Sequence, residues 1–157
     1  MNRTWLTILM IFTCMGLMAT TDSSTDGEKI EQALIKKVVS RAYVDGLLNG
    51  QDLEETRKGF HPDFKLPILN QNRKGLNWLP ISNWIQYTEK QKSEKPDSFR
   101  KRYIGEFKSI DVSGSAAMVK LALYRAGKLI YTDFLSLYRF KGGWKIVGKI
   151  FFQHQKP

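Results

Sequence analysis

Residues 103–153 read YIGEFKSIDVSGSAAMVKLALYRAGKLIYTDFLSLYRFKGGWKIVGKIFFQ, and this stretch decides the fold. It contains runs of alternating apolar and polar residues, which are typical of β-strands. Short turns at 113–115, 125–128 and 141–143 separate these runs. Because turns this short join antiparallel neighbours, we predict a meander of long strands. The predicted strands cover 103–112, 117–124, 129–140 and 144–153.

Helices are predicted ahead of the strands. Apolar residues recur at three- and four-residue steps over 28–48, the spacing of one helix face, and Thr25 to Glu28 fits a capping box. A second helix over 52–60 ends before Pro62. A short strand, a turn-rich segment and a third helix capped by Ser82 follow, at 64–69, at 70–75 and from 82. This order predicts an α+β domain whose helices cover one face of a curved antiparallel sheet.

The N-terminal segment has the pattern of a signal peptide. Arg3 precedes an apolar run over 5–17, which is shorter than the roughly 20 residues of a membrane span. We expect a signal peptide at 1–21, a flexible mature N-terminus at 22–27 and one domain at 28–157. An uncleaved anchor is the alternative. The protein is therefore expected to be exported, periplasmic or secreted, without stable membrane insertion after cleavage.

Charge and cysteine content restrict the partners. The net charge of +10 attracts polyanions without selecting among them, and export argues against nucleic acid as the partner. The only cysteine, Cys14, lies in the predicted signal peptide, and the residues before it do not fit a lipidation site. With His61 and His154 as the only histidines, we expect no metal site, and no cofactor is predicted.

Several segments together resemble one family. They are residues 43–52, 59–63, 131–135 and 143–147, which read YVDGLLNGQD, GFHPD, YTDFL and GWKIV. Together they resemble the "putative lumazine-binding" branch of the nuclear transport factor 2-like superfamily, across 28–153. The resemblance implies a cone of about three helices on a strongly bent antiparallel sheet, a fold also called cystatin-like, and a homodimer. It does not imply that the chain binds lumazine.

The superfamily includes ketosteroid isomerase, in which an Asp base works with a Tyr and a protonated Asp. The resemblance places Tyr43 at the position of that Tyr. Ile68 falls near the position of the base, and Ser136 at that of the second Asp. The base is missing, so we do not expect steroid-type proton abstraction.

The same alignment turns Ser136 and its alternate neighbours toward the cavity. His61, two residues before Asp63, is the main titratable candidate, with a local backbone-capping role as the alternative. Tyr43, Trp78 and Trp84 are candidate ligand contacts, each with ordinary core packing as the alternative. Asp133 and Lys149 are expected to pair across strands in a structural role. The candidate ligand-binding residues are Tyr43, His61, Trp78, Trp84, Phe134, Ser136, Tyr138, Phe151 and Gln153.

These residues support a first hypothesis and leave two alternatives. The first is an exported, non-catalytic domain with one largely apolar pocket for a small apolar or aromatic ligand. The second is a cyclase-, isomerase- or dehydratase-like enzyme that uses His61 and Tyr43, which requires His61 inside the cavity. The third is a dimeric scaffold whose vestigial cavity is filled by Phe134, Tyr138 and Phe151.

Overall fold

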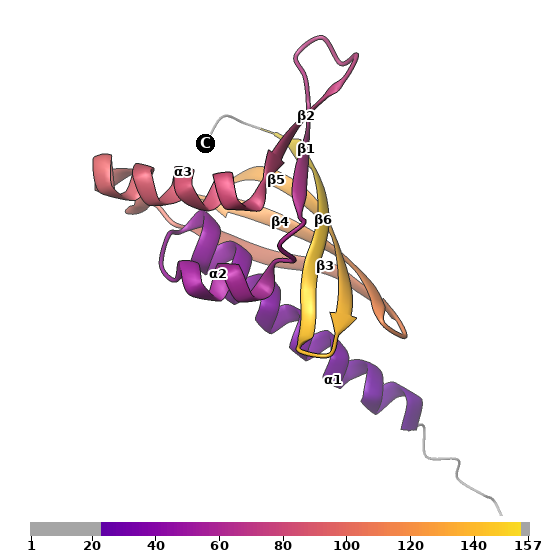
Figure 1. The fold of residues 1–157 in the computed structure, drawn as a ribbon. Helices are drawn as coiled ribbons and strands as arrows, with labels where there is room; N and C mark the ends of the chain where they lie inside the picture. Colours follow the sequence, from indigo (N-terminus) through magenta and orange to yellow (C-terminus); the bar gives the residue numbers. More distant parts are fainter. Residues whose placement is uncertain (1–22, 155–157) are drawn as a thin grey trace, which may run out of the picture.

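The computed structural model describes residues 23–154, so the predicted signal peptide, Cys14 included, lies outside the described residues. The helices and a hairpin lie against one curved sheet (Figure 1). The helical elements are α1 (Ser23–Val38), η1 (Val39–Leu48), α2 (Leu53–Gly59), α3 (Ile81–Glu94) and the short η2 (Pro96–Phe99). The strands are β1 (Lys65–Leu69), β2 (Leu76–Pro80), β3 (Tyr103–Ser113), β4 (Ala116–Arg125), β5 (Lys128–Phe140) and β6 (Gly143–Gln153).

The predicted meander is confirmed. The four-stranded sheet has the order β3-β4-β5-β6, with every neighbouring pair antiparallel. Each pair also contains a register shift, and such bulges bend a sheet. The curved sheet wraps around the helices, as the α+β prediction requires (Figure 1).

The first helix ends at Leu48 as predicted but differs from its prediction at its start and in the winding of its second half. It begins at Ser23, so residues 23–27 are helical where we expected a flexible segment, and the capping box lies inside the helix. Its second half, η1, is a π-helix, in which the backbone is wound more widely than in an α-helix. This half carries the core residues Val39, Ala42, Tyr43 and Leu47.

The second and third helices show one success and one error at their N-termini. α2 starts where predicted, because the Asp52 carboxylate accepts hydrogen bonds from the backbone N–H groups of Glu54 and Glu55, at 3.0 and 3.1 Å. The predicted Ser82 cap is wrong. α3 begins at Ile81 after Pro80, whose φ of −60° suits a helix entry, and the Ser82 hydroxyl bonds the neighbouring Asn83 side chain.

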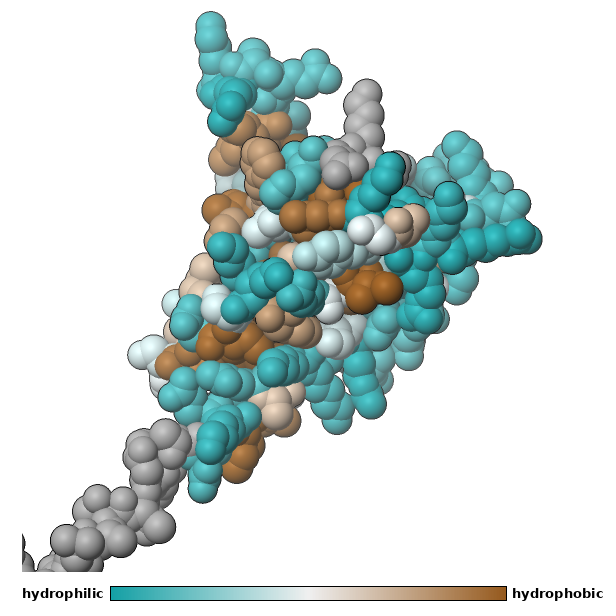
Figure 2. Space-filling view, turned by 180° about the vertical axis from the view of Figure 1, so that it is seen from behind, coloured by the Kyte–Doolittle hydropathy of each residue, from teal (hydrophilic) through white to brown (hydrophobic). Residues whose placement is uncertain are grey.

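The hairpin β1–β2 forms a separate two-stranded sheet that projects from the domain (Figure 1). β1 and the turn after it were predicted. β2 was not, because it includes Asn77 and Pro80, which are poor strand signals. Viewed from behind, the tip of the hairpin is hydrophilic and its base hydrophobic (Figure 2).

The core lies between the helices and the inner face of the sheet. Its largest fully buried side chains come from both layers: Ile35, Val39, Tyr43, Leu47, Phe60, Phe64, Val119, Leu121, Leu123, Leu135, Leu137 and Ile146. The contact between η1 and α2 is especially close. A Cβ added at Gly46 would lie 2.3 Å from Thr56 Oγ1 and 2.6 Å from the Asp52 carbonyl oxygen.

We therefore expect Gly46→Ala to lower the free energy of unfolding by about 1–3 kcal/mol, because η1 and α2 must separate to admit the methyl group. Gly27→Ala is the matched control, since a Cβ there meets nothing within 4 Å. It should leave stability unchanged or raise it by about 0.5–1 kcal/mol. Denaturant unfolding measures both. Equal stability of the two variants would contradict the packing described for Gly46.

Candidate functional site

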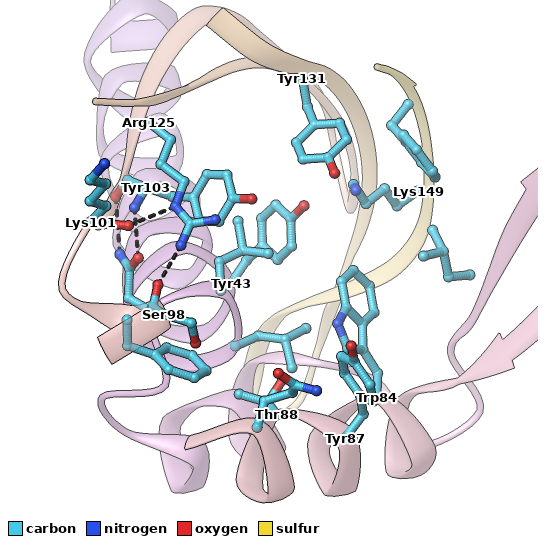
Figure 3. Close-up of a pocket in the computed structure, with 17 residues that line it drawn as sticks. Tyr43, Trp84, Tyr87, Thr88, Ser98, Lys101, Tyr103, Arg125, Tyr131 and Lys149 are labelled. Carbon is cyan, nitrogen blue, oxygen red and sulfur yellow. Dashed lines mark hydrogen bonds between the residues drawn. The ribbon is translucent and has the colours of Figure 1, made fainter. Parts of the chain in front are cut away.

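A cleft of about 410 Å³ opens between η1, α3 and the inner face of the sheet. Seven of its seventeen lining residues are aromatic, and its polar groups come from the end of η1, from α3, from the segment after α3 and from the sheet (Figure 3). The cleft is lined by Tyr43, Leu47, Leu48, Asn49, Leu66, Trp84, Tyr87, Thr88, Gln91, Ser98, Phe99, Lys101, Tyr103, Arg125, Tyr131, Lys149 and Phe151.

Three polar side chains meet at the floor of the cleft. Lys149 Nζ lies 3.1 Å from Asp133 Oδ1, with side-chain exposures of 5% and 0%. The Tyr43 hydroxyl donates a hydrogen bond of 2.6 Å to the other carboxylate oxygen, Asp133 Oδ2. The expected Asp133–Lys149 pair is therefore confirmed, and Tyr43 extends it across the layer between helix and sheet. Asp133 lies beneath the lining, whereas Tyr43 and Lys149 reach the cleft.

Burial perturbs all three groups. Removal from water raises the pKa of the Asp133 carboxyl, and Lys149 and Tyr43 oppose the shift. The same desolvation lowers the pKa of the Lys149 amine, and Asp133 opposes it. The pKa of Tyr43 is raised well above its usual value by burial and by the adjacent Asp133. Lys149 therefore holds its proton less firmly, and Asp133 binds a proton more firmly, than each does in water.

The amine of Lys149 is enclosed by aromatic rings. It lies 4.5 Å from the ring centroid of Phe151, 5.1 Å from that of Tyr43 and 5.5 Å from that of Trp84. Tyr43 and Trp84 also contact each other edge to face, with centroids 6.1 Å apart. Cation–π attraction fixes the position of the ammonium at the inner end of the cleft. In Figure 3 the amine points into the cleft, toward the hydroxyls of Tyr43 and Tyr131.

A bulge in β6 places Lys149 inside. Ser136 pairs with Gly148 but Leu137 pairs with Ile146, so Val147 is the extra residue. Trp144 and Ile146 are buried before the bulge, and Lys149 is buried after it. Without the extra residue, strand alternation would turn Ile150 inward and Lys149 outward.

Two cations stand at the mouth of the cleft. The Arg125 guanidinium lies 5.0 Å over the Tyr103 ring and donates to the carbonyl oxygens of Lys101 and Ser98. Lys101 is exposed. Within residues 23–154 neither cation forms an ion pair with a carboxylate. The mouth therefore carries uncompensated positive charge, while the charges of the floor pair cancel.

Of the predicted ligand contacts, the structure brings Tyr43, Trp84 and Phe151 together in the cleft. The predicted inner face of β5 is wrong. Phe134 and Tyr138 are 37% and 53% exposed and Ser136 lies on their side of the strand, whereas Asp133, Leu135 and Leu137 are buried. The error arose in the alignment with ketosteroid isomerase, which placed Ser136 at the position of the second Asp, beside the Tyr that Tyr43 matches. The structure puts Asp133 there.

The remaining predicted contacts lie elsewhere. Trp78 is 60% exposed on the hairpin, and Gln153 is exposed near the end of β6. The His61 ring stacks on Phe140 at a centroid distance of 5.0 Å, and its Nδ1 accepts a hydrogen bond from the Asp63 backbone. His61 does not line the cleft, so the proposed enzyme loses its base. Phe134 and Tyr138 do not fill the cavity, which removes the basis of the vestigial-pocket hypothesis.

Sequence reasoning missed the mouth of the cleft. Most of the segment 90–102 is exposed. Ser98, Phe99 and Lys101 nevertheless line the cleft, together with Tyr103 and Tyr131. Tyr103 and Tyr131 lie on predicted strands, in step with the inward-facing residues of those strands. This alternation was the signal in the sequence that could have placed them in the cleft.

Residues 23–154 contain neither a helix suited to span a membrane nor a cluster of metal-binding side chains. No helix within residues 23–154 is both long and apolar enough to cross a membrane. In the same range, no group of three or more His, Cys, Asp or Glu side chains is placed to hold a metal ion.

Comparison with known proteins identifies a family and a fold. The model of the family described as "Putative lumazine-binding" matches residues 30–152. Two nuclear transport factor 2-like proteins of unknown function have similar structures. The one from Shewanella baltica has a TM-score of 0.63 and 21% identity, over 82% of this chain and 97% of that one. The one from Silicibacter pomeroyi has a TM-score of 0.63 and 22% identity, over 82% and 98%.

A third similar structure is a domain of unknown function with a cystatin-like fold from Nostoc punctiforme. It has a TM-score of 0.57 and 13% identity, over 81% of this chain and 79% of that one. No significant match was found among curated proteins. The structural neighbours confirm the predicted fold class.

We expect Lys149→Met to destabilise the protein by about 3–5 kcal/mol at neutral pH, because Asp133 would keep a buried charge without its partner. Loss of Lys149 also raises the pKa of Asp133 further, since the lysine opposes the rise. A raised folded-state pKa gives stability that is present below the unfolded value of about 3.9 and is lost as pH rises. The deficit of this variant against wild type should therefore grow between about pH 4 and pH 7, as measured by urea unfolding.

The double variant Lys149→Met/Asp133→Asn is the control. It removes both charges and keeps an acceptor for Tyr43, so it should recover most of the lost stability and lose the added pH dependence. A single-variant deficit that is constant with pH would contradict a buried ion pair.

Proposed function

We propose, from the premise that this chain belongs to the "putative lumazine-binding" family of the nuclear transport factor 2-like superfamily, that its cleft binds a flat aromatic ligand with an anionic group at its outer end. A small-ligand-binding role is what the family description supports. The shape and charge of the ligand are inferred from the cleft.

The aromatic walls favour a flat ring system. Trp84, Tyr103, Tyr131 and Phe151 approach from different elements around one space of about 410 Å³. This volume lies within the usual range of about 300–1,000 Å³ for small-molecule sites. Aromatic side chains stack on or contact flat ligands edge to face, and each such contact contributes about 0.5–1.5 kcal/mol beyond burial alone.

Charge orients the ligand, and this uneven distribution is the observation that carries the proposal. At the floor, Lys149 is matched by Asp133, so an additional anion gains little there. At the mouth, Arg125 and Lys101 have no acidic partner in the described part of the chain. An anionic ligand group is therefore stabilised at the mouth, while an uncharged end enters the aromatic interior.

Export and self-association belong to the same proposal. The pattern of residues 1–21 supports export through a signal peptide. A homodimer is supported by apolar side chains exposed on the outer face of the sheet. These are Ile104, Met118, Phe134, Tyr138, Ile150 and Phe152. We propose binding without catalysis, since the one acid–base candidate from the sequence, His61, lies outside the cleft.

We expect the purified protein to bind 2-naphthoate more tightly than the neutral 2-naphthalenemethanol, because only the former has a charge for the mouth. Trp84→Ala should weaken binding of both compounds by roughly tenfold, the equivalent of about 1.4 kcal/mol. Lys101→Gln should weaken binding of the naphthoate alone, by a few-fold, because an exposed charge pair contributes only about 0.2–1 kcal/mol. Isothermal titration calorimetry measures the affinities, and native mass spectrometry detects any ligand that copurifies.

Trp78→Ala and Lys128→Gln are the matched controls, since neither residue lines the cleft. Both should retain wild-type affinity. Binding that is lost equally in the Trp78 and Trp84 variants, or that shows no preference for the anion, would overturn the proposal.

A further inference from the structure

Lys149 has features that its role as a buried counter-ion does not require. A structural ion pair needs no access to a cavity, yet the amine of Lys149 lines the cleft while its partner Asp133 lies beneath the lining. It is the innermost nucleophilic group of the cleft, and its side chain is only 5% exposed. The aromatic rings around it leave the cleft as its open side.

We propose that Lys149 forms a covalent imine with the carbonyl group of an aromatic aldehyde or ketone bound in the cleft. This inference deepens the proposed function and rests on it, because the aromatic ligand must first enter with its uncharged end toward the floor. The carbonyl is that uncharged end, and the anionic group remains at the mouth beside Arg125 and Lys101.

Asp133 supplies the proton transfers that imine formation requires. Its carboxylate, 3.1 Å from the amine, takes a proton from the Lys149 ammonium and frees the nitrogen lone pair. The lone pair attacks the carbonyl carbon, a C–N bond forms, and the nitrogen's proton passes to the former carbonyl oxygen. Asp133 then returns its proton to the resulting hydroxyl group, which leaves as water while the C=N bond forms. Overall, an ammonium and a carbonyl give a protonated imine and one water.

The charge balance of the floor favours this product. The protonated imine carries the same single positive charge as the ammonium that it replaces, so Asp133 has a counter-ion before and after the reaction, and both groups are neutral while Asp133 holds the proton. Tyr43 continues to donate its hydrogen bond of 2.6 Å to Asp133 Oδ2 and holds the carboxylate in place. The groups that face the amine are Asp133, Tyr43, Trp84 and Phe151, and none of these carries a second positive charge.

Desolvation of the amine also favours imine formation. The lowered pKa of Lys149 leaves a larger neutral fraction than an exposed lysine has at the same pH. A neutral amine is the reactive form, and lysines buried in hydrophobic pockets are activated in this way.

The test uses 6-formyl-2-naphthoate, which joins the proposed anionic end to an aldehyde. The purified protein is incubated with this compound and sodium cyanoborohydride at neutral pH, and peptide mass mapping locates the reduced adducts. We expect Lys149 to be modified at least about tenfold faster than exposed lysines outside the cleft, such as Lys128 and Lys141. An excess of 2-naphthoate, which occupies the cleft but has no aldehyde, should protect Lys149 and leave the exposed lysines unaffected.

Variants distinguish the contribution of the Lys149 amine from that of the residues around it. Lys149→Arg keeps the positive charge but forms no imine, so the fast adduct should disappear. Lys128→Arg is the matched control outside the cleft and should retain it. Asp133→Asn should slow modification of Lys149 by removing the proton acceptor. Circular dichroism checks the fold of each variant, and the protection experiment needs only the wild-type protein.

The outcomes distinguish the imine from the proposed function. The alcohol 6-(hydroxymethyl)-2-naphthoate measures reversible binding of the same shape without the aldehyde. Binding of the alcohol together with slow or unprotected labelling of Lys149 would overturn the imine and leave the ligand-binding function intact. Failure of both compounds to bind would overturn both. Fast, protected labelling at Lys149 supports the imine.

Discussion

The buried ion pair between Lys149 and Asp133 is the interaction on which the rest of the structure depends. It joins β6 to β5 at the floor of the cleft, and through the Tyr43 hydroxyl it joins the sheet to η1. Burial of two charges costs several kcal/mol per ion, and each partner is tolerated only because the other lies beside it. A hydrophobic pair of similar size would pack at least as well. The polar floor therefore points to function more than to stability.

The geometry that holds this pair comes from irregular features of regular elements. The extra residue Val147 turns Lys149 inward, and the wide turns of η1 carry Tyr43. Gly46 lets η1 pack closely against α2. Bulges and π-helical turns occur often at functional sites, because they redirect side chains without changing the fold.

The sequence predicts the order of the helices and strands well, but it predicts less well which face of each strand is buried. Periodicity and short turns were sufficient for the meander and the long first helix, since these are local signals. The inner face of β5 was predicted wrongly, because strand alternation leaves two choices and the alignment through Ser136 selected the wrong one. On β6 the choice depended on a bulge that no local signal reveals. The Asp133–Lys149 pair was nevertheless predicted, because opposite charges on neighbouring apolar strands need each other.

In this structure Lys149 is a desolvated amine that faces the cleft. The most direct measurement is a pH titration of the lysine side-chain ¹³Cε resonances by NMR, with and without 2-naphthoate. We expect Lys149 to titrate at a lower pH than the exposed lysines. Its resonance should move when the ligand binds, whereas that of Lys128, which lies outside the cleft, should not. Titration together with the exposed lysines, and no response of Lys149 to a bound ligand, would contradict this placement of Lys149.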